Sequence, residues 1–239
     1  MIFAAGRGSR LGPLGEQMPK ALLEVGGITL LERTMRNLVA AGADRIIVNV
    51  SHLADRMVAY LERLDPSVDV RVSHEPGKPL ETGGGLLHAR SHFRHHAPFF
   101  LHNVDVLTDA DLPTMYDAHL RSGALATLAT NRRDTPRRLL FDERGLFGRE
   151  DARRGLRLEA RPRQGDVRTR AFAGIHVVAP AFFGLVTETG FFSILDPYLR
   201  LAAEGHCIAD HAVDDAHWME VGTPDRLDAA RAAWRDGID

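Results

Sequence analysis

Short apolar runs alternate with helical patterns along the first half of this chain, and this alternation restricts the possible folds more than any other feature. Short apolar runs are typical of buried strands, and apolar residues spaced three and four apart are typical of helices. Repeated strand–helix–strand units join parallel strands through helices that cover both faces of a sheet. The pattern therefore predicts an α/β fold with a Rossmann-like, doubly wound, mainly parallel sheet. The expected strands are 2–4, 45–50, 68–72 and 99–104, and the expected helices are 30–41, 53–64 and 84–94.

The second half of the chain interrupts this pattern once and then resumes it. Residues 131–170 are charged and rich in turn formers, which predicts a small β-rich insertion or lid with strands at 138–141 and 156–159. A chain of 239 residues has the length of one large domain, so residues 1–239 are expected to form a single domain. The other expected elements are a helix at 112–121 with Thr108 and Asp111 as a capping box, strands at 124–130, 172–178 and 218–221, and helices at 194–203 and from Thr223 onward.

Composition excludes several classes of protein. The formal net charge is −2 and the isoelectric point is near 6.6, which gives no electrostatic reason to expect nucleic acid as a partner. The single cysteine, Cys207, cannot form an intramolecular disulfide. No stretch is apolar enough for a signal peptide or a membrane span, which predicts a cytoplasmic protein without a membrane partner. The sequence does not indicate an oligomeric state.

A glycine-rich loop follows the first expected strand, in the sequence Ala-Ala-Gly-Arg-Gly-Ser-Arg-Leu at residues 4–11. Its glycines let the backbone turn sharply and bring amide groups close to an anion. The loop is neither a dinucleotide-binding turn nor a Walker A motif, because the third glycine and the Gly-Lys-Ser/Thr ending are missing. A simple connecting turn is the alternative. Arg10 and Lys20 favour phosphate binding, because both carry the charge that phosphate oxygens attract.

Together, the loop and the later Pro19-Lys20 pair resemble the signature of the sugar-phosphate nucleotidyltransferases, which reads A-A-G-x-G-x-R followed by P-K. The resemblance implies an enzyme that takes a nucleoside triphosphate and a sugar 1-phosphate as its substrates. It implies that Ala5, Gly6 and Gly8 bind the triphosphate, with Arg10 on its β and γ phosphates and Lys20 near the reacting phosphates. Arg10, Lys20 and Asp105 would then be the catalytic residues.

Two further segments carry the same resemblance, and each has a plain structural alternative. Three glycines at 83–85 follow Glu81 and Thr82 at an expected helix start, where free amides could meet a nucleobase or merely loosen the helix entry. The resemblance assigns Glu81, Thr82 and Gly83 to nucleotide binding. It assigns Gly174 to the sugar, although packing within a buried strand also explains that glycine. Asn103 is assigned to both the nucleotide and the sugar.

Asp105 and Glu220 are the candidate Mg²⁺ ligands. Asp105 ends an apolar strand, and carboxyl ends of strands in such sheets face the ligand crevice. Mg²⁺ prefers few carboxylates together with phosphate oxygens and water, and Glu220 on a later strand could supply the second carboxylate. Helix capping by Asp105 and simple solvation of Glu220 are the alternatives. The family pattern has N-G-D and W-x-D-V-G-T, so this chain departs from it at Val104 and at Glu220.

These residues predict an attack by the sugar 1-phosphate on the α-phosphorus of the triphosphate, with release of pyrophosphate. UTP with N-acetylmuramate 1-phosphate ranks ahead of GTP with mannose or heptose 1-phosphate. The departures at Val104 and Glu220 keep a second class open, a non-catalytic sensor of nucleotide sugars. A third class is a cytidylyltransferase for a phosphate such as phosphocholine, which the aromatic content of 7% disfavours.

Overall fold

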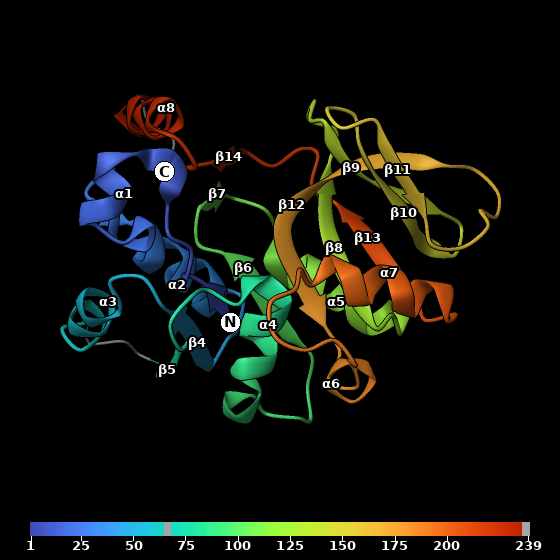
Figure 1. Ribbon diagram of the computed structural model, residues 1–239, viewed down its shortest axis with the longest axis horizontal. Coiled ribbons are helices and arrows are strands. Elements are labelled where there is room, and N and C mark those ends of the chain that lie inside the picture. The colour runs from blue at the N-terminus through green and yellow to red at the C-terminus, as the bar shows by residue number, and fades with distance from the viewer. Residues whose placement is uncertain (65–67, 236–239) are drawn as a thin grey trace.

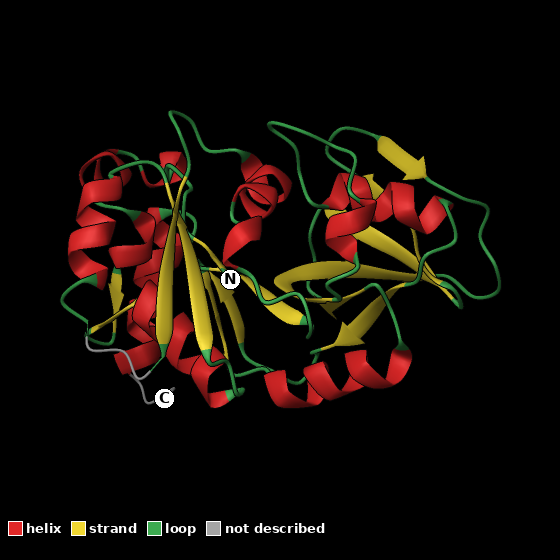
Figure 2. Ribbon diagram, turned by 90° about the horizontal axis from the view of Figure 1, so that it is seen from below, coloured by secondary structure: helices red, strands yellow, loops and turns green. Residues whose placement is uncertain are grey.

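The computed structural model describes residues 1–64 and 68–235. Its strands and helices form two lobes that share one long sheet (Figures 1 and 2). In chain order the strands are β1 (Ile2–Phe3), β2 (Glu24–Val25), β3 (Ile28–Thr29), β4 (Arg45–Val50), β5 (Asp69–His74), β6 (Phe99–Asn103), β7 (Val106–Thr108), β8 (Ala126–Asn131), β9 (Arg137–Asp142), β10 (Gly145–Asp151), β11 (Leu156–Glu159), β12 (Arg168–Val178), β13 (Ile208–Ala212) and β14 (Trp218–Glu220).

Along the chain the α-helices alternate with these strands, and in space they cover both faces of the sheet (Figure 2). They are α1 (Pro13–Gln17), α2 (Leu30–Ala40), α3 (Ala54–Leu61), α4 (Glu81–His88), α5 (Leu112–Ser122), α6 (Phe182–Leu185), α7 (Leu195–Ala203) and α8 (Pro224–Arg235). Short 3-10 helices occur at Ser9–Leu11, Lys20–Leu22 and Arg90–His92. Among the residues that the structure describes, no helix is both long and apolar enough to cross a membrane.

The large sheet has its strands in the order β11-β10-β9-β12-β6-β1-β4-β5, and β8 joins it between β12 and β13. Strands β6, β1, β4 and β5 are parallel, which confirms the α/β fold with a mostly parallel centre. The segment 131–170 supplies β9, β10 and β11 as an antiparallel extension, as the β-rich prediction required. Its action as a lid stays a prediction.

The central strands are buried on both faces. Ile46 and Val48 of β4 belong to the hydrophobic cluster that includes residues of α2 and α3, whereas Ile47 belongs to a cluster with α4 and α7. Alternate residues of a strand point to opposite faces, so a run of apolar residues meets helices on each side. The packing therefore holds the central strands between helices on both faces.

Two helix starts differ from the sequence predictions. Helix α4 begins at Glu81 instead of residue 84, so the three glycines lie inside the helix and are buried. The start of α5 is not a capping box: Asp111 is itself the N-cap and accepts a hydrogen bond from the Thr114 amide at 2.9 Å. Thr108 instead accepts from the amide of Ala110 at 3.1 Å. A side chain can cap several nearby amides, and sequence spacing alone does not select one.

Candidate functional site

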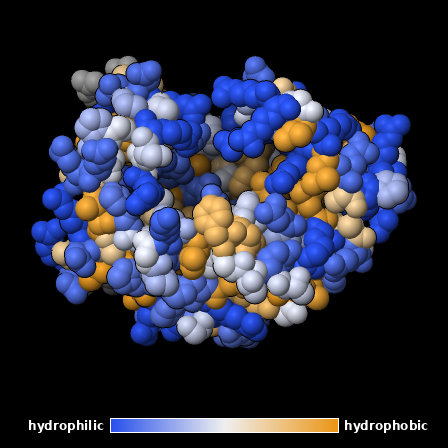
Figure 3. Space-filling view, in the orientation of Figure 1, coloured by the Kyte–Doolittle hydropathy of each residue, from blue (hydrophilic) through white to orange (hydrophobic). Residues whose placement is uncertain are grey.

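The candidate site lies at the carboxyl edge of the parallel strands, where the loops after β1 and β6 emerge beside β14. In Figure 3 the surface is hollowed between the lobe that carries α1 and α8 and the lobe that carries β9 to β12. The residues predicted from sequence come from widely separated segments, and the sheet brings their backbones to this edge. Ile2 and Phe3 of β1 pair with the two residues that end β6, His102 and Asn103.

The glycine-rich loop is tightly turned. Gly8 has φ of +63°, and a side-chain carbon at this position would lie 3.3 Å from Leu11 and 3.6 Å from Lys20. Gly6 is exposed and has open space around it, which leaves room for a ligand beside its backbone. Ala5 is buried beneath the loop. The sequence reasoning missed Gly15, where any side chain would overlap the carbonyl of Gly8.

A buried chain of hydrogen bonds connects this loop to the start of α4. The Ala4 amide donates to Oδ1 of Asn49 at 2.7 Å, and Nδ2 of Asn49 donates to Oε1 of Glu75 at 2.6 Å. Oε2 of Glu75 then accepts from the Leu80 amide at 2.7 Å. Glu75 is only 1% exposed. A carboxylate is seldom buried without strong partners, and the hydrogen bonds from Asn49 and Leu80 supply them here. The chain therefore ties the predicted phosphate loop to the predicted base segment.

The glycines of α4 serve packing in this structure. The amides of Gly83 and Gly84 donate to the carbonyl of Phe192 at 3.0 and 3.3 Å, so the expectation of free amides at this helix start was wrong. A side chain at Gly83 would overlap the ring of Phe192, and one at Gly85 would lie 2.5 Å from Oε1 of Glu75. These glycines let the loop that carries Phe192 and the buried Glu75 pack directly against the helix.

The other two residues predicted in this segment differ in exposure. Thr82 accepts a hydrogen bond from the Ile194 amide at 3.0 Å, which gives its side chain a structural partner. Glu81 is exposed and has φ of +64°, a conformation that is uncommon outside glycine. Strained backbone of this kind is often found at ligand sites, which is consistent with a role of Glu81 in nucleotide binding. That role stays a prediction.

Four charged residues from distant segments meet as ion pairs. Lys20 pairs with Asp105, and their side chains are 12% and 16% exposed. Arg10 contacts Glu220 at 2.8 Å, and Glu220 also pairs with Arg226, a residue that sequence reasoning missed. Burial of Glu220 raises its pKa, but the hydrogen bond and positive charge of Arg10, helped by Arg226, hold the pKa below its ordinary value.

The pairing of β7 with β14 brings the two predicted metal ligands to neighbouring backbone positions. Glu220 lies opposite Val106, and the Val221 amide donates to the carbonyl of Asp105 at 2.8 Å. Two carboxylates are the kind of donor set that Mg²⁺ accepts when phosphate oxygens complete its shell. The two acids suit that role chemically, and their present partners are Lys20 and the two arginines. No group of three or more His, Cys, Asp or Glu residues within the described ranges is arranged to hold a metal ion.

The two residues predicted to meet the sugar lie against each other. Gly174 has φ of +84° and sits in a register shift of β12 between Phe172 and His176. A side-chain carbon there would lie 3.0 Å from Nδ2 of Asn103 and 2.9 Å from Val106. Glycine is therefore required for two reasons, the left-handed backbone and the close contact with Asn103.

Arg133 and Trp218 form a further contact that sequence reasoning missed. The guanidinium carbon of Arg133 lies 3.9 Å from the centroid of the Trp218 ring. Trp218 donates its indole N–H to the carbonyl of Ala173 at 2.8 Å, beside Gly174. The sequence motif around Trp218 indicates a role only for its acidic residue, and nothing near Arg133 in the sequence indicates a partner across the fold.

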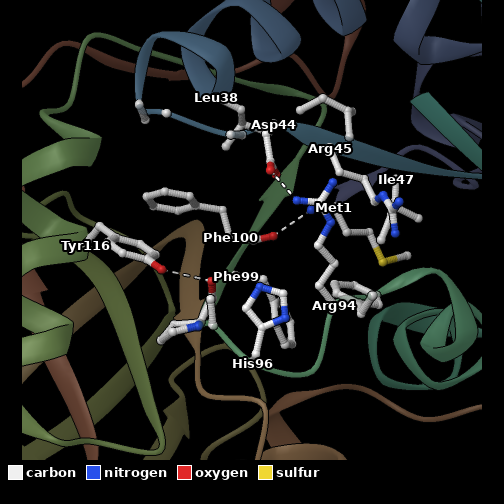
Figure 4. A pocket seen from close by; sticks show the side chains of 17 residues that line it. Met1, Leu38, Asp44, Arg45, Ile47, Arg94, His96, Phe99, Phe100 and Tyr116 are labelled. Atoms are coloured by element: carbon white, nitrogen blue, oxygen red, sulfur yellow. Dashed lines mark hydrogen bonds and ion pairs between the residues drawn. The ribbon is translucent and has the colours of Figure 1, made fainter. Parts of the chain in front are cut away.

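A pocket of about 310 Å³ lies at the opposite, amino-terminal edge of the parallel strands (Figure 4). Met1, Phe99, Phe100 and Tyr116 are among its lining residues, and Asp44 and Arg94 form an ion pair beside it. None of the residues predicted for substrate or metal binding lines this pocket. It is therefore separate from the candidate site.

Comparison with known proteins finds similar sequences and a similar fold. The model of the MobA-like NTP transferase domain matches residues 1–171. N-acetylmuramate alpha-1-phosphate uridylyltransferase from Caulobacter vibrioides is 30% identical over 238 residues, covering 97% of this chain and 95% of that protein. Mannose-1-phosphate guanyltransferase from Aspergillus fumigatus is 26% identical and covers 94% of this chain, which spans 60% of that protein. The crystal structure of HddC from Yersinia pseudotuberculosis shares the fold, with a TM-score of 0.76, 20% identity and coverage of 98% and 97% of the two chains.

Proposed function

Because this chain belongs to the family of MobA-like NTP transferase domains, we propose that it is a sugar 1-phosphate nucleotidyltransferase. The observation that carries the proposal is the pairing of two cations with carboxylates at the carboxyl edge of the sheet: Arg10 of the glycine-rich loop pairs with Glu220, and Lys20 pairs with Asp105. Such an arrangement of loop amides, paired cations and acids suits a ligand with several phosphate groups.

In the proposed reaction, an oxygen of the sugar phosphate attacks the α-phosphorus of the nucleoside triphosphate. A new P–O bond forms as the bond between the α-phosphorus and the bridging oxygen breaks, and pyrophosphate leaves with that oxygen. The sugar phosphate is already an anionic nucleophile near neutral pH, so no protein nucleophile is needed. The protein aligns two anions and offsets their repulsion, which is the main source of catalysis in such transfers.

The residues of the chain divide this work. The loop offers amides to the triphosphate other than those of Ala4 and Leu11, which already donate within the protein. Arg10 exchanges its contact with Glu220 for phosphate oxygens. Lys20 stays beside the reacting phosphates, because its position next to Asp105 is partly enclosed. Gly174 and Asn103, which lie against each other, contact the sugar.

Mg²⁺ forms part of this proposal. Asp105 and Glu220 would hold the ion, which supplies positive charge to the phosphates when it is bound. Glutamate is longer than the aspartate of the family pattern, but the β7–β14 register keeps its backbone beside that of Asp105. Activity that resists EDTA would contradict the Mg²⁺ proposal and leave the transfer proposal intact.

UTP and N-acetylmuramate 1-phosphate are the substrate pair that we propose. The relative named for that reaction aligns along nearly the full length of both chains, whereas the mannose-1-phosphate guanyltransferase is longer and less similar. GTP with mannose 1-phosphate is the alternative pair.

The test is pyrophosphate release from UTP, GTP, CTP, ATP and dTTP, each combined with N-acetylmuramate, mannose, glucose and heptose 1-phosphates. Reactions run with Mg²⁺ and with EDTA. We expect metal-dependent release with one preferred pair. If no pair releases pyrophosphate while the protein binds a nucleotide sugar tightly, the chain is a sensor instead of an enzyme.

A further inference from the structure

Arg133 is held in a fixed orientation between two strands of the candidate site. Its Nη1 donates to Oδ1 of Asn131 at 2.8 Å, and its Nη2 donates to the carbonyl of Phe172 at 2.5 Å. The guanidinium group lies over the Trp218 ring, whose own indole N–H is bonded to Ala173. An arginine fixed in this way loses little conformational freedom when it binds a ligand.

The cation stands beside the residues proposed to meet the sugar. Phe172 and Ala173, which contact Arg133 and Trp218, directly precede Gly174. Trp218 and Glu220 are two residues apart on β14, so their side chains share one face of that strand. Arg133 therefore lies near both the proposed sugar position and the proposed metal ligand, whose negative charge acts on its guanidinium group.

Among the residues that the structure describes, Arg133 also has no acidic partner. Within residues 1–64 and 68–235, no carboxylate lies within ion-pair distance of its guanidinium group, whereas Arg10 and Arg226 pair with Glu220 and Arg132 pairs with Asp214. Partial burial lowers the pKa of Arg133, an effect that the negative charge of Glu220 opposes. A guanidinium group has five N–H donors, and two of its nitrogens already donate to protein oxygens. The remaining donors can receive an oxyanion.

On the basis of the proposed function, we propose that Arg133 binds an oxyanion of the sugar substrate and so helps to determine its specificity. Two groups share this chemistry, the phosphate at C1 and the carboxylate of an acidic sugar. Both match the planar fork of arginine. Arg10 and Lys20 are already assigned to the triphosphate, and Arg133 supplies the separate cation that the second anion requires.

The test compares Arg133→Gln and Arg133→Lys with the control Arg132→Gln. Arg132 is the neighbouring residue, its side chain is 82% exposed, and it pairs with Asp214. Pyrophosphate release gives separate KM values for the triphosphate and for the sugar phosphate. We expect Arg133→Gln to raise the KM of the sugar phosphate about 10- to 100-fold, the range for a lost hydrogen bond to a charged group, and to change the KM of the triphosphate less than about twofold. Arg133→Lys should recover part of the affinity, and the control should match the wild type.

Two sugar phosphates distinguish the oxyanions. N-acetylmuramate 1-phosphate carries a carboxylate, and N-acetylglucosamine 1-phosphate lacks it. Equal losses with both identify the C1 phosphate as the group bound, and a loss only with the acidic sugar identifies the carboxylate. An unchanged KM for both sugars in Arg133→Gln would overturn the proposal.

Direct binding separates this proposal from the reaction itself. Titration of each sugar phosphate into the protein, followed by Trp fluorescence and calorimetry, needs no turnover. Weaker binding to Arg133→Gln, with an unchanged thermal unfolding midpoint, would support the role of Arg133 even if no triphosphate is consumed. Equal binding to wild type and variant would refute it. If Arg133→Gln does not fold, the same comparison uses Arg133→Lys, which keeps the charge and loses the fork.

Discussion

Replacement of Glu75 by glutamine tests whether the buried hydrogen-bond chain joins the two glycine-rich segments. The chain begins and ends at fixed backbone donors, the amides of Ala4 and Leu80, with Asn49 and Glu75 between them. A carboxylate accepts at both oxygens, whereas a glutamine amide accepts at one end and donates at the other. Whichever way the new amide turns, one N–H group meets another N–H group. Rotation of the Asn49 amide only moves that conflict from Leu80 to Ala4.

The expected loss follows from burial. Glu75 and Asn49 are 1% and 3% exposed, so water does not readily replace the missing acceptor. A buried donor without a partner costs about 1–3 kcal/mol, and we expect Glu75→Gln to lower the free energy of unfolding by that amount. The KM of the triphosphate should rise as well, because the same chain holds the start of the phosphate loop. Urea unfolding and pyrophosphate release measure the two effects.

A second substitution at Asn49 makes the prediction specific. Asn49→Asp alone places two carboxylates together without a donor between them, and like charges at that distance oppose ionisation of both. In the double variant the new aspartate accepts from Ala4 and from the new glutamine, whose oxygen accepts from Leu80, so every donor regains a partner. We expect a favourable coupling of at least about 1 kcal/mol between the two changes. If the losses simply add, the proposed chain does not hold these segments.

Three further predictions concern charge, space and pH. Lys20→Met should lower turnover at least about a hundredfold, which is the effect of removing one preorganised charge. The surface control Arg36→Gln should keep the turnover of the wild type. Near-normal turnover in Lys20→Met would exclude Lys20 from the mechanism. Gly174→Ala should raise the KM of the sugar phosphate and lower the free energy of unfolding in urea by about 2–5 kcal/mol, because backbone strain and steric overlap add. Gly123 also has a positive φ but has open space around it, so Gly123→Ala should lower that free energy by only about 1–2 kcal/mol. Equal losses in the two variants would refute the contact between Gly174 and Asn103. Burial lowers the pKa of His102 to about 4 and that of His176 to about 3, so as the pH falls the unfolded chain takes up protons before the folded protein does. The free energy of unfolding should therefore decrease below about pH 6.5, by about 1.4 kcal/mol per pH unit for each histidine. A constant free energy of unfolding between pH 6.5 and pH 4.5 would contradict the burial of these histidines as neutral groups.

The sequence alone was sufficient to predict those features whose physical cause lies in residues close together along the chain. A buried strand followed by a helical pattern depends on the order of apolar residues over a few turns, which is why the βαβ half could be predicted. The glycine at position 8 could also be identified, since a left-handed turn needs a residue without a side chain. The end of β6 predicted where Asp105 would stand, because parallel strands present their carboxyl ends at one edge.

Tertiary structure decided which side chains meet. Arg10 and Glu220 are 210 positions apart, and they meet because β14 pairs with β7 at the sheet edge from which the loop after β1 emerges. Glu75 gave no signal in the sequence, because its importance comes from burial between Asn49 and Leu80, not from its neighbours. Local spacing also misassigned the α4 amides, since it contains nothing about the carbonyl of Phe192 that accepts from them. By itself the sequence determined the α/β framework and the residues available for phosphate chemistry. Their partners were determined by packing, because a hydrogen bond or ion pair depends on distances that the whole fold sets.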